Sequence, residues 1–191
     1  MQNFVYLLID DESGEAMVID SGWETGPVVR AAAEERARVK YVVATHGHFD
    51  HVGTLKDLAA KLGANTVAHE ASELGPDLVV RDGDRLVLGR NQVTVLYTPG
   101  HTKDSICLFD GLEVFTGDTL FIGNCGRTDL PGGSTEQLFH SLHDILLKLP
   151  PETTIYPGHD YGDVPNRKMG EESGLNPTLR ARSLEEFTGI E

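Results

Sequence analysis

The amino-acid sequence predicts a single α/β domain built as a layered sandwich of sheet and helix. Short apolar runs rich in β-branched residues alternate with amphipathic stretches, and the strand-like runs gather towards both ends of the chain. No internal repeat or polar linker interrupts this pattern. A chain of 191 residues can bury a substantial core as one domain. We therefore treat residues 1–191 as one unit.

The chain opens with a predicted β-hairpin. Its strands are residues 3–9 and 16–20, and Gly14 is available for the turn between them. A helix is expected next over residues 27–38, because Pro27 suits a first helical turn and the alanine run has a high helix propensity.

The later elements again mix strands with helices. Residues 39–44 are short, apolar and β-branched, which is typical of a buried strand. Residues 55–62 follow a helical period that Gly63 ends. Residues 135–147 form the strongest predicted helix, because four aliphatic side chains share one face. The remaining strands are expected at residues 66–69, 85–88, 92–97, 105–109, 113–116 and 153–156.

Charge and composition exclude several classes of partner. The 30 acidic and 16 basic residues give a net charge of −14, which repels phosphate backbones, so we expect no nucleic-acid partner. The apolar run at residues 4–9 is too short to cross a membrane and is followed at once by acids, so we expect neither a membrane partner nor a signal peptide. Cys107 and Cys125 form no spaced framework, which indicates a reducing compartment. We expect a cytoplasmic monomer or homodimer.

Potential metal ligands follow four of the predicted strands. The stretch "THGHFDHVG" at residues 45–53 comes directly after the strand at residues 39–44. The stretches "TPGHT", "FTGDT" and "YPGHD" follow three later strands, and in each a glycine precedes the ligand, where the missing Cβ permits a positive φ and close packing. The candidate ligands are His46, His48, Asp50, His51, His101, Asp118 and His159, and the glycines are Gly100, Gly117 and Gly158.

The number of ligands predicts two divalent metal ions. Five histidines and two carboxylates exceed the four ligands of one tetrahedral Zn²⁺. We expect one ion at His46, His48 and His101, a second at Asp50, His51 and His159, and Asp118 as the bridge. Imidazole and carboxylate ligands suit Zn²⁺, the ion we expect, and also Fe²⁺ or Mn²⁺. Two such ions about 3.5–4 Å apart can lower the pKa of a shared water towards ~7.

Taken in order, the seven ligands resemble the complete ligand set of the metallo-β-lactamase superfamily. The resemblance runs over nearly the whole chain, from the predicted hairpin to the stretch "LNPTL" near the C-terminus. It implies an α/β fold of the αβ/βα four-layer type, with the metals at one edge of the sandwich.

The stretch "FTGDTLFIGNCGRTDLPGGS" resembles two branches of that superfamily, the compact glyoxalase II-type thioester hydrolases and the persulfide dioxygenases. "CGRTD" and "HDY" resemble the dioxygenases, which implies a single Fe²⁺ at His46, His101 and Asp118. Phe49, the position of Gly53 and "GRTDLPGG" are closer to the hydrolases. We favour the hydrolase and keep the dioxygenase as the alternative.

Other members of the superfamily fit the sequence less well. The β-lactamases with a cysteine ligand lack the HxHxDH run, and flavodiiron proteins carry Glu where His48 stands. RNA-processing members are larger and need a surface that binds nucleic acid. A metal-stabilised scaffold without catalysis is the non-enzymatic alternative, but degenerate members usually lose ligands and all seven are present here.

The favoured resemblance implies that a metal-bound hydroxide attacks the carbonyl of a small thiol-derived substrate, a thioester such as a hydroxyacylglutathione. We expect Asp50 to be catalytic by orienting the hydroxide, Arg127 to bind an anionic substrate group, and Tyr161 to line the pocket. The sequence ends soon after His159, so we expect no separate helical C-terminal domain, which leaves the thiol carrier open. In the alternative, a mononuclear iron persulfide dioxygenase oxidises glutathione persulfide.

Overall fold

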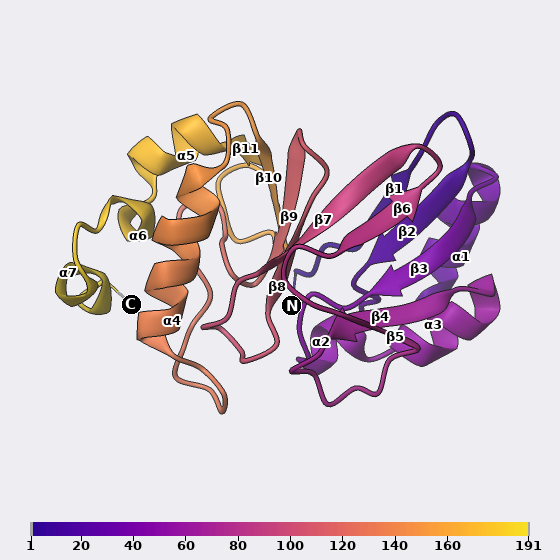
Figure 1. Ribbon diagram of the computed structural model, residues 1–191, viewed down its shortest axis with the longest axis horizontal. Coiled ribbons are helices and arrows are strands. Elements are labelled where there is room, and N and C mark those ends of the chain that lie inside the picture. The colour runs from indigo at the N-terminus through magenta and orange to yellow at the C-terminus, as the bar shows by residue number, and fades with distance from the viewer. Residues whose placement is uncertain (1, 191) are drawn as a thin grey trace.

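The strand and helix pattern folds into two β-sheets that pack face to face between two layers of helices (Figure 1). The structure is a computed structural model and describes residues 2–190. Its order of layers, helix–sheet–sheet–helix, confirms the αβ/βα four-layer sandwich expected from the sequence.

The first sheet forms from the N-terminal part of the chain, with strand order β1-β2-β3-β4-β5. β1 and β2 are an antiparallel hairpin, and β2 to β5 run parallel. Parallel strands need crossover connections, and the helices α1 and α3 supply two of them. The strands are β1 (Tyr6–Ile9), β2 (Glu15–Ile19), β3 (Arg38–Val43), β4 (Asn65–His69) and β5 (Leu78–Val80).

The second sheet has strand order β11-β10-β9-β8-β7-β6. All its neighbouring strands are antiparallel except β9 and β10, which run parallel. The strands are β6 (Arg85–Leu88), β7 (Asn91–Tyr97), β8 (Ile106–Phe109), β9 (Glu113–Gly117), β10 (Thr154–Pro157) and β11 (Arg167–Lys168).

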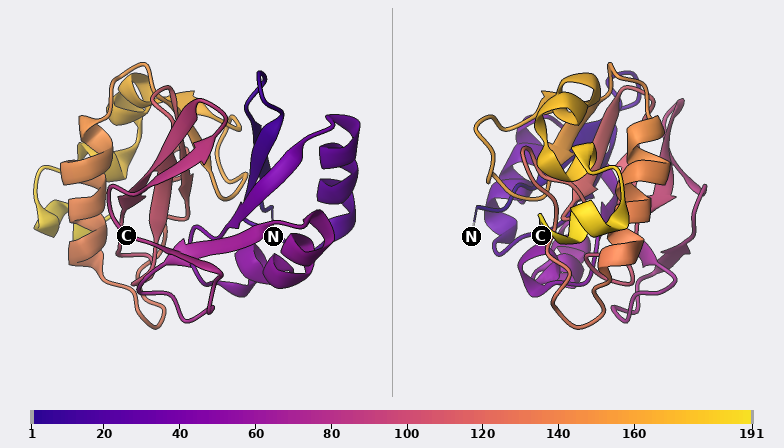
Figure 2. Two further views of the ribbon diagram at one scale, coloured as in Figure 1. Left: turned by 45° about the vertical axis from the view of Figure 1, so that its right-hand side comes forward. Right: turned by 90° about the vertical axis from the view of Figure 1, so that its left-hand side faces the viewer.

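Helices cover the outer face of each sheet. α1 (Thr25–Glu34) and α3 (Leu55–Leu62) pack on the first sheet. The second sheet is covered by α4 (Thr135–His140), α5 (Met169–Leu175), α6 (Pro177–Arg180) and α7 (Leu184–Thr188), which face the viewer in the right panel of Figure 2. Among residues 2–190, no helix has both the length and the apolar character needed to cross a bilayer.

The alternation of side chains along β2 shows how the layers are held together. Met17 and Ile19 point into the core between the two sheets, whereas Ala16 and Val18 point outwards to the helices. All four are at most 1% exposed. Fully burying an aliphatic side chain of this size stabilises the fold by roughly 1.5–3 kcal/mol relative to leaving it exposed. Successive residues of β2 therefore pack in two different layers, one between the two sheets and one against the helices.

All nine predicted strands form, with ends shifted by up to three residues. The helix at 55–62 and the strand at 85–88 have the predicted bounds. The helix predicted over residues 27–38 starts earlier and ends at Glu34, because Arg36 adopts a left-handed conformation with φ 54°. Left-handed backbone cannot continue a right-handed helix.

The predicted helix at residues 135–147 is present but changes its hydrogen bonding along its length. α4 continues as a π-helical turn over Ser141–Ile145 and ends in a 3₁₀ turn over Leu146–Lys148. Several short elements were not predicted: α2 (Phe49–Val52), β5, β11 and the C-terminal helices α5 to α7. Elements of two to seven residues carry too little periodicity to be recognised from sequence.

Candidate metal centre

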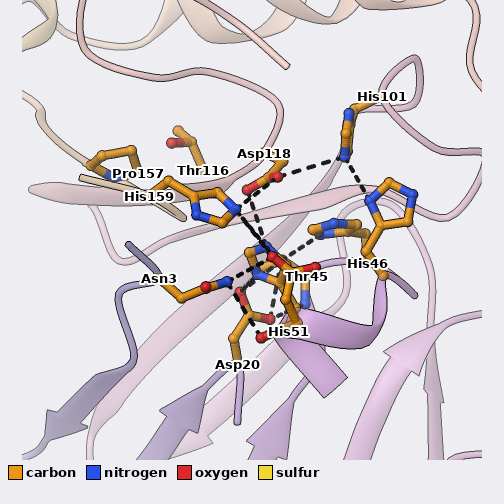
Figure 3. A network of polar contacts seen from close by, with 12 residues as sticks. Asn3, Asp20, Thr45, His46, His51, His101, Thr116, Asp118, Pro157 and His159 are labelled. Atoms are coloured by element: carbon orange, nitrogen blue, oxygen red, sulfur yellow. Dashed lines mark hydrogen bonds and ion pairs between the residues drawn. The ribbon is translucent and has the colours of Figure 1, made fainter. Parts of the chain in front are cut away.

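Four segments that follow strands of the two sheets bring all seven candidate ligands together. Figure 3 labels five of them, His46, His51, His101, Asp118 and His159. The loop after β3 carries His46 and His48, the short helix α2 carries Asp50 and His51, and the loops after β7, β9 and β10 carry one ligand each. The ligands are His46, His48, Asp50, His51, His101, Asp118 and His159.

The nitrogen and oxygen atoms of these side chains lie at short distances from one another. His48 Nδ1 is 2.9 Å from His101 Nε2, and His51 Nε2 is 3.1 Å from His159 Nε2. The Asp118 carboxylate lies 3.3 Å from His51 Nε2 and 3.2 Å from His159 Nε2. Ligand atoms within 4.8 Å of one another form three groups: His46, His48 and His101; His46, His51 and Asp118; Asp50, His51 and His159.

The first and third of these groups contain the same residues as the two ion sites expected from the sequence. The second group, which includes Asp118, shares His46 with the first and His51 with the third. His46 Nε2 and Asp118 Oδ1 are buried and have no hydrogen-bond partner among residues 2–190. Buried polar atoms are normally paired, so two such atoms at the centre of a cluster point to an absent partner. Facing imidazole nitrogens can share only one proton, whereas a cation can accept a lone pair from each. The donor set therefore fits divalent metal ions.

The charge states of the cluster also favour a metal. Burial holds the pKa of His46 well below its ordinary value, so this imidazole is neutral. Burial alone raises the pKa of Asp118, but the close contacts with His159 and His51 outweigh it and hold the pKa well below its usual range. Neutral imidazole and ionised carboxylate are the forms that bind metals.

His51 is oriented by a residue that the sequence did not single out. Its Nδ1 atom lies 2.8 Å from Asp20 Oδ2, and both side chains are buried. Burial lowers the pKa of His51, but the carboxylates of Asp20 and Asp118 outweigh it and raise the pKa to about 11. This imidazole must release its proton to bind a metal ion. Asp20 lies at the end of the predicted strand at residues 16–20, but only the folded chain places it beside His51.

Asp20 also reaches His46 through a hydroxyl group. The Thr45 hydroxyl donates to the Asp20 carboxylate at 2.9 Å, and it lies 3.1 Å from His46 Nδ1. His46 Nδ1 then donates to the same hydroxyl, which leaves Nε2 free of its proton. One buried carboxylate thus fixes two candidate ligands.

His101 and Asp50 have similar supports. His101 Nδ1 donates to the backbone carbonyl of Arg127 at 2.7 Å, so its Nε2 faces the cluster. Asn3 Nδ2 donates to Asp50 Oδ2 at 2.9 Å and was not recognised from the sequence. Asp50 is half-buried and its carboxylate lies 3.4 Å from His159 Nε2. Partners of this kind orient metal ligands and tune their basicity.

All three predicted glycines are needed for close packing, since a Cβ at Gly100 would overlap the backbone of Leu138. Gly117 has a φ of 49°, and a Cβ there would lie 2.6 Å from the Thr45 hydroxyl oxygen. Gly158 does not have a positive φ, but a Cβ would overlap the Asp118 carboxylate and lie 2.9 Å from the carbonyl carbon of Gly117. At Gly158, the space beside the ligand is therefore the reason for glycine rather than the backbone conformation.

A cavity of about 660 Å³ opens onto the cluster. Of the seven candidate ligands, only His101 and Asp118 line it. Its other walls come from residues 121–125, from Arg127 and from residues 161–163. A molecule in the cavity therefore meets the cluster at His101 and Asp118, which follow strands of the second sheet.

Both residues expected to contact substrate line this cavity. Tyr161 stacks on His159 with ring centroids 4.6 Å apart and planes 2° from parallel, and it is 55% exposed. The Arg127 guanidinium forms a forked ion pair with Asp129, with both contacts at 2.6 Å. Asp129 therefore competes for the group that was expected to bind an anionic substrate.

Comparisons with known proteins agree with this geometry. The model of the family described as "Metallo-beta-lactamase superfamily" matches residues 1–159. The human protein named "Persulfide dioxygenase ETHE1, mitochondrial" is 40% identical over 193 residues, covering 98% of this chain and 75% of the human protein. A hydroxyacylglutathione hydrolase from Salmonella dublin is 37% identical over 161 residues, covering 83% of this chain and 62% of that protein.

The fold is also found among solved structures. The crystal structure of ETHE1 from Myxococcus xanthus superposes with a TM-score of 0.93 and is 36% identical in sequence. The match covers 99% of this chain and 84% of that one. The similarity therefore includes the C-terminal helices as well as the residues that carry the candidate ligands.

Proposed function

Because this chain belongs to the metallo-beta-lactamase superfamily, we propose that it is an iron-dependent persulfide dioxygenase whose metal is held by His46, His101 and Asp118. The observation that carries the proposal is the 40% identity to the human persulfide dioxygenase over 98% of this chain. The hydrolase favoured in the sequence analysis has weaker support, because the hydrolase relative matches 83% of the chain at 37% identity. The persulfide dioxygenase is therefore the function that we propose, and the thioester hydrolase becomes the second candidate.

The geometry of the cavity supports this choice. His101 and Asp118, two of the three proposed iron ligands, are the ligands that line it. On the inner side, His46 supplies a buried nitrogen that has no hydrogen-bond partner among residues 2–190. An ion held by these three side chains would face the cavity directly, and a small persulfide could reach it without displacing a ligand.

The proposed reaction balances with one molecule of O₂ and one of water. A persulfide RSSH, O₂ and H₂O give the thiol RSH, sulfite and two protons, so the terminal sulfur is oxidised and O₂ is reduced. When bound, Fe²⁺ supplies the open coordination positions and the redox chemistry for this step. His46 and His101 would hold the metal as neutral imidazoles and Asp118 as an ionised carboxylate, and Phe121 and Tyr161 present aromatic surface along the cavity.

The substrate residues act around this centre. Tyr161 lies flat against His159 at the mouth of the cavity, where its ring can contact the carrier of the persulfide. Arg127 can bind a carboxylate of the carrier if that carboxylate replaces Asp129 in the forked pair. Both features suit a small anionic thiol such as glutathione.

The test is oxygen consumption by the iron-loaded protein. Protein reconstituted anaerobically with Fe²⁺ should consume O₂ when given glutathione persulfide and should release one sulfite for each O₂. His101→Ala should abolish this uptake, whereas His140→Ala should retain it, because the His140 side chain is 59% exposed and lies outside the cluster. No uptake by protein with confirmed bound iron would overturn the proposal.

Thioester hydrolysis remains the second candidate, because all seven ligands of a two-metal centre converge here. Asp50, His51 and His159 are not needed for a single iron at the other three ligands. A hydrolase would use them to hold a second ion, and Asp50 would orient the attacking water. Turnover of a hydroxyacylglutathione by zinc-loaded protein, with no O₂ uptake by the iron form, would favour this function.

A further inference from the structure

The two segments that form the outer walls of the cavity are irregular. Residues 121–125 form one wall and residues 161–163 form the other. The two segments touch, since a Cβ added at Gly162 would lie 2.6 Å from Ile122 Cβ. No named strand or helix of residues 2–190 includes either segment. The first has a turn in which the Phe121 N–H donates to the Asn124 carbonyl at 2.9 Å, and an isolated bridge joins Leu120 to Cys125. Side chains from elsewhere in the chain add further contacts.

Glu172 on α5 fixes the first wall. Its side chain is fully buried, and Oε1 accepts a hydrogen bond from the Gly123 backbone N–H at 2.6 Å. Oε2 accepts from Arg167 Nη1 at 2.8 Å. A buried carboxylate requires partners of this kind, and here one of them is the backbone of the cavity wall.

Arg167 connects the first wall to the second. The guanidinium Nη2 donates to both carboxylate oxygens of Asp163, at 2.7 and 2.8 Å, while Nη1 donates to Glu172. The Arg167 side chain is only 9% exposed. A planar guanidinium can bind two carboxylates in fixed directions, which an ammonium group cannot do.

Asn176 makes a further pair of contacts with the first wall. This residue belongs to the stretch "LNPTL" and is fully buried. Its Nδ2 atom donates to the backbone carbonyls of Phe121 at 3.3 Å and Asn124 at 3.0 Å. Its Oδ1 atom accepts from the Thr178 backbone N–H at 2.9 Å and so caps α6.

We propose that Arg167, Glu172 and Asn176 are positioning residues that set the separation of the two cavity walls and thereby the affinity for the substrate carrier. None of the three lines the cavity. They act through Gly123, through the carbonyls of the first wall and through Asp163. The inference rests on the proposed function only in taking this cavity as the place where the persulfide carrier binds.

If Arg167, Glu172 and Asn176 only stabilised the fold, their variants would behave differently. Removing one partner of a buried ion pair destabilises a protein wherever the pair lies. A structural role would lower the melting temperature and leave KM unchanged in the folded fraction. Positioning of the walls predicts instead a higher KM with little change in kcat, because the iron ligands are not disturbed.

The experiment compares three variants of the full-length, iron-loaded chain. Arg167→Met removes the link between the walls, and Glu172→Gln keeps an acceptor for the Gly123 N–H while losing the charge that Arg167 binds. Arg81→Met is the matched control, because the Arg81–Glu70 pair has a similar length of 2.7 Å but is exposed.

For Arg167→Met we expect KM for glutathione persulfide to rise about tenfold and kcat to change less than about twofold, the signature of lost binding. Glu172→Gln should raise KM less, and Arg81→Met should leave both parameters unchanged. A KM for Arg167→Met equal to that of the wild type would overturn the inference. So would a parallel fall in kcat and in bound iron.

Hydrogen exchange separates this inference from the proposed function. The Gly123 amide should exchange faster in Arg167→Met than in the wild type, because its acceptor Glu172 loses the Arg167 contact and keeps only the one from Asn176 Nδ2. If the wild type shows no O₂ uptake, the proposed function fails, but the exchange rate still tests the positioning. Unchanged exchange at Gly123 would overturn the positioning role whatever the enzyme's activity.

Discussion

His51 Nδ1 donates a hydrogen bond to Asp20 Oδ2 across 2.8 Å, and this contact directs the opposite ring nitrogen towards His159 and Asp118. The two residues lie 31 positions apart in the chain. The residue that follows β2 and the helix α2 are thereby joined beneath the candidate metal site.

Asp20→Ala should weaken metal binding about 10–100-fold, the usual effect of removing a partner that orients a histidine ligand. Both His51 and the Thr45 hydroxyl lose their acceptor in this variant. Competition with a chromophoric chelator measures the affinity. Asp57→Ala is the control, because Asp57 pairs with Lys61 on the exposed face of α3. Equal affinities for the two variants would show that Asp20 does not orient the ligands.

His159→Ala should distinguish the two candidate functions. An iron held by His46, His101 and Asp118 does not need His159, so the variant should keep its iron and lose less than about tenfold in O₂ uptake. A two-metal hydrolase would lose the ion of its second site and most of its thioesterase activity. Iron content and O₂ uptake, measured on the same sample, decide between these outcomes. Loss of all iron in His159→Ala would contradict the one-ion assignment.

Gly158→Ala should disturb the metal site while the fold remains. The added Cβ would overlap the Asp118 carboxylate, and overpacking of this kind typically destabilises a protein by about 1–3 kcal/mol. We expect bound metal to fall well below the wild-type content, with an unchanged circular dichroism spectrum. Gly174→Ala is the control, since nothing lies within 4 Å of its added Cβ. Full metal content in Gly158→Ala would show that the site adapts to the methyl group.

Glu15 should contribute a pH-dependent part of the stability. A hydrogen bond from the Gly89 N–H, followed by contacts with Lys40 and Arg38, lowers the pKa of Glu15 to about 2. A lowered carboxyl pKa stabilises the folded state above the unfolded pKa of 4.5, and this contribution is lost as the pH falls towards 2.

The measurement for Glu15 is the urea midpoint of the wild type and of Glu15→Gln as a function of pH. The difference between them should be constant above about pH 4.5 and should shrink as the pH falls towards 2. A difference that does not change between pH 7 and pH 3 would contradict this prediction.

The sequence predicted the candidate ligands because they stand in short loops directly after apolar strands. His101, Asp118 and His159 each follow a glycine at the end of a strand, a signal that needs no tertiary information. Asp20 and Asn3 carry no such signal, because each reaches the site through a contact made only in the folded chain.

Elements of the fold were likewise predicted where a local sequence signal marks them and missed where only packing in the folded chain forms them. The helix at 55–62 was predicted with its observed bounds, since Gly63 ends it in a left-handed conformation with φ 66°. The C-terminal helices were missed although Asn176 and Ser183 cap α6 and α7. Those helices have four and five residues, too few for a hydrophobic period, and packing on the second sheet stabilises them.

The facing pair His51 and His159 lies 108 positions apart, and this separation has a consequence for the order of events during synthesis. The first sheet and the loop from His46 to His51 can form while the second sheet is still being made, since domains begin to fold as the chain emerges. His159 joins the cluster only after β10 has entered its sheet. The three ligands proposed for iron are complete sooner, once Asp118 follows β9, so a nascent chain stalled before residue 118 should bind iron far more weakly than the finished one.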